Sequence, residues 1–83
     1  MPYIPIHERP EIDDELDMLK LTVNTSGQLN YAITKLVHYF LGDSPRYDDY
    51  NSVIGVLECA KLELYRRQVA IYEDQKIEEN GDV

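Results

Sequence analysis

The chain has 83 residues and a mass of 9.7 kDa, which is enough for one small domain and excludes a two-domain enzyme. Acidic residues outnumber basic ones 16 to 8 and give a net charge of -8, so direct binding to the phosphates of nucleic acid is not expected. The hydrophobic content of 43% is too high for a disordered acidic chain, and we expect a folded domain.

The sequence predicts a protein of the cytoplasm that does not enter a membrane. Its apolar runs are far shorter than the about 20 residues that a membrane-spanning helix needs. The first residues carry no basic stretch followed by an apolar one, so no signal peptide is expected. The single cysteine, Cys59, cannot form a disulfide within the chain, and this suits a reducing compartment.

Residues 1–9 are expected to form an extended arm. Pro2 and Pro5 fix the backbone angle φ and push the residues before them towards extended geometry. The apolar residues of the arm would tether it in a groove on the same subunit or on a neighbour; they are Tyr3, Ile4 and Ile6.

A first helix is predicted from Pro10, because proline is tolerated in the first turn of a helix. Several carboxylates follow at once, where the positive end of the helix dipole favours them. The apolar residues recur at steps of four, three and four, which is typical of one helix face; they are Ile12, Leu16, Leu19 and Val23. Residues 24–27 break this pattern, and Thr25 or Ser26 would cap the next helix.

A second helix is predicted up to Gly42. Its apolar positions have the spacing of a buried helix face; they are Leu29, Ile33, Leu36, Val37 and Phe40. Glycine accepts the left-handed backbone of a C-terminal cap, and residues 43–45 have the composition of a turn.

A long third helix is predicted from about Asp48 to about Tyr72, because no proline interrupts this stretch. At 1.5 Å per residue it would be about 36 Å long, against about 20 Å for each of the first two helices. Such a helix would leave part of its apolar face uncovered by its own partners, which favours a homo-oligomer. The alternative is a break near Gln68, with residues 69–77 forming a short fourth element.

Together these elements predict an all-α fold, namely a small three-helix bundle with a long third helix and an extended N-terminal arm. Residues 1–83 are expected to be a single domain with its helical core over residues 10–77. Residues 78–83 are polar and contain an Asn-Gly pair, so a flexible acidic C-terminal tail is expected there.

One group of residues is a candidate binding site. Lys61, Tyr65, Arg66 and Arg67 form a basic and aromatic patch in an acidic chain, suited to a small anionic ligand or an acidic partner segment. Tyr31, near the start of the second helix, is assigned to the same set of contacts. The alternative interpretation is a solvated face, on which acidic residues three or four positions away neutralise these cations.

No constellation in the sequence indicates catalysis or a cofactor. His7 and His38 lie far apart, and no metal-binding spacing of histidine or cysteine is present. The chain also has neither a glycine-rich phosphate loop nor a serine nucleophile motif. We therefore expect no metal, no cofactor and no enzymatic activity.

Four stretches of the chain carry a resemblance to a known family. They are the opening Met-Pro-Tyr-Ile, residues 27–34 (Gly-Gln-Leu-Asn-Tyr-Ala-Ile-Thr), residues 54–67 (Ile-Gly-Val-Leu-Glu-Cys-Ala-Lys-Leu-Glu-Leu-Tyr-Arg-Arg) and residues 72–83, ending in Glu-Asn-Gly-Asp-Val. Over nearly its whole length the chain resembles a family of small proteins of unknown function from bacterial and phage genomes. The resemblance implies a phage or prophage accessory protein and brings no catalytic or binding residues. The family pattern has a proline where this chain has Ile71, which weakens the case for a helix break there.

The function expected from the sequence is therefore that of a small, non-enzymatic protein that self-associates and binds a protein or a small anionic ligand. The alternative is a phage inhibitor of host defence that sequesters a nucleotide signal or mimics nucleic acid with its acidic surface. Sequestration would require the arginines to converge in a pocket. Mimicry would require rows of carboxylates, of which residues 13–17 are the one dense run.

Overall fold

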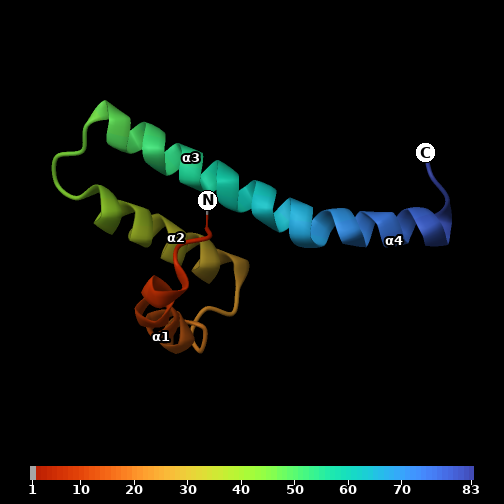
Figure 1. The fold of residues 1–83 in the computed structure, drawn as a ribbon, viewed down its shortest axis with the longest axis horizontal. Coiled ribbons are helices and arrows are strands. Elements are labelled where there is room, and N and C mark those ends of the chain that lie inside the picture. Colours follow the sequence, from red (N-terminus) through yellow and green to blue (C-terminus); the bar gives the residue numbers. More distant parts are fainter. Residues whose placement is uncertain (1) are drawn as a thin grey trace. The chain divides into compact units, whose positions relative to one another are not determined.

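The computed structural model describes residues 2–83, and the contacts between their Cα atoms divide them into two units. The first unit is Tyr3–Val53, and the second contains Ile54–Val83 together with Pro2. The elements in chain order are the 3-10 helix η1 (Ile6–Glu8), α1 (Arg9–Leu19), α2 (Ser26–Leu41), α3 (Tyr47–Leu64), the π-helical turn η2 (Tyr65–Val69) and α4 (Ala70–Asn80) (Figure 1).

The described residues contain helices and no strand, which confirms the predicted all-α class. The fold has three helices, because α3, η2 and α4 follow one another without a break over 34 residues. The prediction of a long third helix is therefore confirmed, and this helix extends beyond its predicted end at Tyr72 to Asn80.

The N-terminal arm is shorter than predicted. Residues 6–8 form one turn of 3-10 helix, in which the Glu8 backbone N–H donates to the Pro5 carbonyl at 3.0 Å. Arg9 Nε donates to the Ile4 carbonyl at 2.8 Å and so holds the segment before this turn. The prediction of extended chain is wrong for residues 6–9, because residues 6–8 form this turn and Arg9 begins the next helix. Met1 lies outside the described residues.

Helix α1 begins one residue before Pro10 and ends at Leu19, short of the predicted apolar residue Val23. The next residues form a turn, in which the backbone N–H groups of Thr22 and Val23 both donate to the Leu19 carbonyl, at 2.9 and 3.1 Å. The apolar pattern thus continues into a turn that follows the helix.

Helix α2 begins with a reciprocal pair of hydrogen bonds between Thr25 and Gln28. Thr25 Oγ1 accepts from the Gln28 backbone N–H at 3.1 Å, and Gln28 Oε1 accepts from the Thr25 backbone N–H at 3.1 Å. This capping box satisfies two backbone donors at the helix start and identifies Thr25 as the cap. The helix ends at Leu41, and Gly42 follows with a φ of 72°, as the predicted C-terminal glycine requires.

The long helix has no break near Gln68, where the sequence left one open as an alternative. Instead of ending there, it widens into the π-helical turn η2, which accommodates one extra residue and then returns to α geometry. It also continues through residues 78–80, so the tail predicted for residues 78–83 begins later than expected. Lys76 and Glu79 form an ion pair at 3.1 Å in this last stretch, and the helix ends where Gly81 takes a φ of 90°.

Burial of apolar side chains is sparse. Among the described residues Val53 is the one buried hydrophobic residue, with 7% of its surface exposed. Leu16 on α1 is 50% exposed, and Leu36 and Phe40 on α2 are 66% and 74% exposed. The helix faces predicted from apolar spacing are present, but this chain by itself leaves them open.

Candidate functional site

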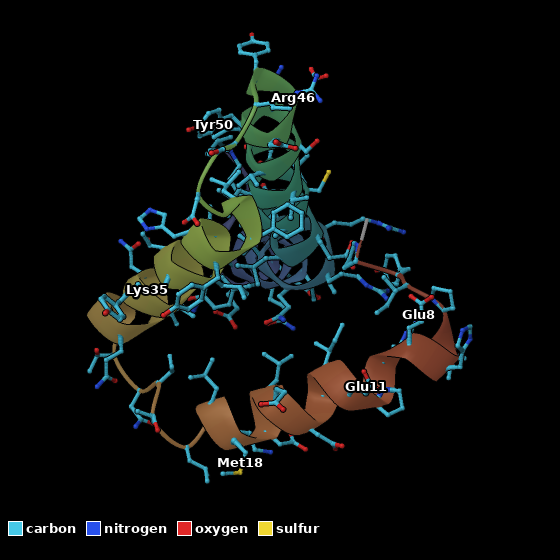
Figure 2. All side chains as sticks on the ribbon, turned by 90° about the vertical axis from the view of Figure 1, so that its left-hand side faces the viewer. Glu8, Glu11, Met18, Lys35, Arg46 and Tyr50 are labelled. Atoms are coloured by element: carbon cyan, nitrogen blue, oxygen red, sulfur yellow. The ribbon has the colours of Figure 1, made fainter. Side chains whose placement is uncertain are left out.

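A groove lies between α1 and α2 in the unit Tyr3–Val53. Its volume is about 1130 Å³. The residues that line it are Glu11, Ile12, Asp14, Glu15, Leu16, Leu19, Thr22, Val23, Gly27, Gln28, Tyr31, Ala32, Lys35, Leu36 and Tyr39. Figure 2 shows Glu11 on α1 and Lys35 on α2, while Met18 lies on the side of α1 that faces away from α2.

The floor of the groove is apolar because both helices turn an apolar stripe towards it. On α1 this stripe is Ile12, Leu16 and Leu19, which repeat at helical spacing. On α2 the aromatic ring of Tyr31 and the side chain of Leu36 line the opposite side. Side chains that the sequence assigns to a buried helix face therefore line an open groove.

The α2 wall of the groove carries a cation held between two aromatic rings. Lys35 Nζ lies 5.9 Å from the ring centroid of Tyr31 and 5.4 Å from that of Tyr39. The two tyrosines stand one turn before and one turn after the lysine, which is why both rings reach it. Contacts of this kind contribute about 0.5–1 kcal/mol at exposed sites, so they orient the ammonium group at the groove.

The α1 edge of the groove is acidic. Glu11, Asp14 and Glu15 all line it, on a helix that has five carboxylates and one arginine. No ion pair joins Glu15 to another of the residues that the structure describes. The groove thus combines an apolar floor, an acidic edge and a cationic, aromatic wall.

The five residues predicted as contacts fall in both units. Tyr31 lies in Tyr3–Val53, where it lines the groove with 67% of its surface exposed. Lys61 on α3 and the other three, which begin the turn η2, belong to Ile54–Val83. The structure brings these last four together on consecutive turns of one helix, and their role in binding stays a prediction.

Two of the three cations in this set have partners close by. Lys61 Nζ lies 3.1 Å from Glu58 Oε1, and Arg67 Nε lies 3.1 Å from Glu63 Oε1. These pairs match the interpretation of a salt-bridged face for Lys61 and Arg67. Arg66 differs, because among residues 2–83 no ion pair engages it.

The π turn brings Glu73 onto the same face of the helix as Tyr65. Positions eight apart in an α-helix point about 80° away from each other, whereas one extra residue in the turn brings Tyr65 and Glu73 to about 20° of the same face. A hydrogen bond to the Glu73 carboxylate, and then its negative charge, raise the pKa of Tyr65 above its usual 10.0. The neutral phenol of Tyr65 is therefore favoured beside Glu73.

Sequence reasoning missed the groove because it assigned the apolar face of α1 to a closed core. A signal was nevertheless present: Tyr31, Lys35 and Tyr39 recur every four residues, which places a cation between two rings on one face. The acidic edge of α1 was interpreted through the helix dipole alone.

Two further features bear on the chemistry of residues 2–83, namely metal ligands and helix length. No group of three or more histidine, cysteine, aspartate or glutamate side chains among them is arranged to hold a metal ion. No helix in this part of the chain has the length and apolar character to cross a membrane.

Comparison with known proteins identifies a family for the whole chain. No curated protein and no solved structure matches it. Residues 1–83 match the family described as Domain of unknown function (DUF6899). The resemblance to a family of unknown function is thereby confirmed over the full length, and the chain belongs to this family.

Proposed function

We propose that this protein is a non-enzymatic interaction protein of the cytoplasm that self-associates, its helices completing their burial against another copy. The observation that carries the proposal is the exposure of apolar faces: Val53 is buried, while Leu16 and Leu36 are each at least 50% exposed. Exposed apolar surface that is contiguous, as in the groove between α1 and α2, is typical of an interaction site.

The free energy of folding supports the same conclusion. Ordering one residue costs about 1–2 kcal/mol of conformational entropy, and burial of a leucine or isoleucine side chain returns about 1.5–3 kcal/mol. Among the described residues only Val53 is a buried hydrophobic residue, so burial within one copy offsets little of the entropy cost of folding. Small domains in this position are commonly stabilised by oligomerisation, which makes folding depend on protein concentration.

The contacts proposed for association are those of the groove and of the basic patch. Tyr31 supplies the groove wall, and Lys61, Tyr65, Arg66 and Arg67 supply the patch. The resemblance to small proteins of bacterial and phage genomes supports a role as a phage or prophage accessory protein, and the single Cys59 supports a reducing compartment.

The test compares two leucine-sized side chains on α1 that differ in where they point. Light scattering and circular dichroism are measured over a dilution series for the wild type, Leu16→Ser and Met18→Ser. We expect the wild type to be a dimer or larger that loses mass and helicity together on dilution. Leu16→Ser, in the groove, should weaken association by about 2 kcal/mol for each copy of the contact.

Met18→Ser is the matched control, because Met18 is 70% exposed on the opposite side of α1 and should leave association unchanged. A wild type that stays monomeric and fully helical at every concentration would overturn the proposal.

A further inference from the structure

We propose that the groove between α1 and α2 of one copy receives the basic segment of a second copy, defined as residues 61–67 of its long helix. This inference rests on the proposed self-association and names the two surfaces that meet. It places an arginine of the segment against the acidic edge of the groove.

The two helical walls of the groove favour a helix as its occupant. Its volume of about 1130 Å³ leaves room for a segment of polypeptide. Its two walls are helices with apolar residues at helical spacing, which is the arrangement that receives an amphipathic helix in a groove. The occupant is therefore a segment with a row of apolar side chains and polar groups beside it.

The basic segment has this character. Leu62 and Tyr65 are three positions apart and so share a helix face, and they are 55% and 47% exposed, so each has apolar surface left to bury. The segment carries three of the eight basic residues of the chain within seven positions and a single acidic residue, Glu63. No other stretch of this acidic chain is as basic, which is why a second copy would present this segment to the groove.

Charge complementarity sets the orientation. The edge formed by Glu11, Asp14 and Glu15 is negative and lies beside the apolar floor. Within the part of the chain that the structure describes, neither Glu15 nor Arg66 has an ion-pair partner, whereas Lys61 and Arg67 are paired on their own helix. Arg66 is therefore the cation available to Glu15 of the other copy, and the flanking apolar contacts would partly shield this pair from water.

The test exchanges the two charges between copies. In a two-fold dimer each contact occurs twice. Glu15→Lys by itself then places two cations at both contacts, and Arg66→Glu by itself places two anions there, so each variant should dimerise about 30-fold more weakly than the wild type. A mixture of the two variants restores both contacts, because one pairs Lys with Glu and the other keeps the original Glu and Arg. Dimerisation in the mixture should return to within a few-fold of the wild type.

Matched controls separate the specific pair from total charge. Asp17→Lys makes the same charge change as Glu15→Lys at a position of α1 that does not line the groove. Lys76→Glu makes the same kind of reversal as Arg66→Glu further along the long helix. Both controls should dimerise as the wild type does within about threefold, and mixing them should change nothing.

The outcomes distinguish the two proposals. A wild type that is monomeric at all concentrations ends the proposed function and this inference with it. If the wild type dimerises but the mixture of Glu15→Lys and Arg66→Glu stays as weak as either variant, self-association stands and this contact is refuted. Should the reversed variants fail to fold even when mixed, Glu15→Gln and Arg66→Gln decide. Each neutral variant should lose part of the affinity, and their mixture should recover one of the two contacts.

Discussion

The two units of the molecule obtain their helices by different means. In Tyr3–Val53, short helices are delimited by specific end signals: the Thr25 and Gln28 capping box starts α2, and Gly42 ends it. In Ile54–Val83, one helix runs on through a π turn, and pairs such as Glu63 with Arg67 link side chains one turn apart. Both mechanisms are local, and neither requires burial, which is why the helices form with their apolar faces still open.

The largest expected effect tests the continuity of the long helix. Ile71→Pro removes a backbone donor and places a ring against the preceding turn, which costs about 3 kcal/mol in a helix interior. We expect a clear loss of helicity by circular dichroism and a lower midpoint of thermal unfolding. Ile71→Ala, which keeps the backbone donor, is the control; an equal loss with alanine would show that the side chain matters more than the continuity of the helix.

A smaller effect tests the end signals of the other unit. Thr25→Ala removes the hydroxyl that accepts from the Gln28 backbone N–H, and loss of such a cap costs about 1 kcal/mol. Chemical denaturation should show this decrease in the free energy of unfolding, while Thr25→Ser should retain most of the stability. If alanine and serine behave alike, α2 does not depend on its cap.

The smallest effect concerns the contact that the π turn creates. The Glu73 carboxylate raises the pKa of Tyr65, so the neutral phenol is favoured in the folded chain. This stabilising contribution is fully present below pH 10, the ordinary tyrosine range, and is lost as the pH rises through the raised pKa. Ultraviolet titration of the tyrosines should show one phenol that ionises late, and Glu73→Gln should bring it back towards the others. If the late-ionising phenol keeps its pKa in Glu73→Gln, Glu73 is not the group that raises the pKa of Tyr65.

Much of the fold could be predicted from the sequence, because its determinants are local. Thr25 and Gly42 mark the two ends of α2, and the absence of proline after Asp48 indicates a long helix. The groove could not be predicted, since apolar spacing on α1 fits a closed core and an open surface equally well. The π turn contains no glycine or proline that would predict it from the sequence. Only the structure therefore shows that Tyr65 and Glu73 share a face of the helix.

For the basic patch, the sequence identifies the residues but not the partners of their side chains. Lys61, Tyr65, Arg66 and Arg67 stood out because basic residues are rare in this acidic chain. The sequence does not show which of these cations has an ion-pair partner. In the structure Lys61 pairs with Glu58 and Arg67 pairs with Glu63, so Arg66 is the cation of the patch that the experiments should change. That distinction depends on side-chain geometry within a single turn, which spacing alone does not resolve.

The π turn also has a consequence for tolerance to changes in chain length. Deleting one residue from an α-helix rotates everything after it by about 100° and scrambles the face that it presents. Deleting one residue from Tyr65–Val69 instead returns a wide turn to ordinary α geometry and leaves Ala70–Asn80 facing as before. The turn Tyr65–Val69 therefore holds one residue that could be removed without redirecting the helix after it.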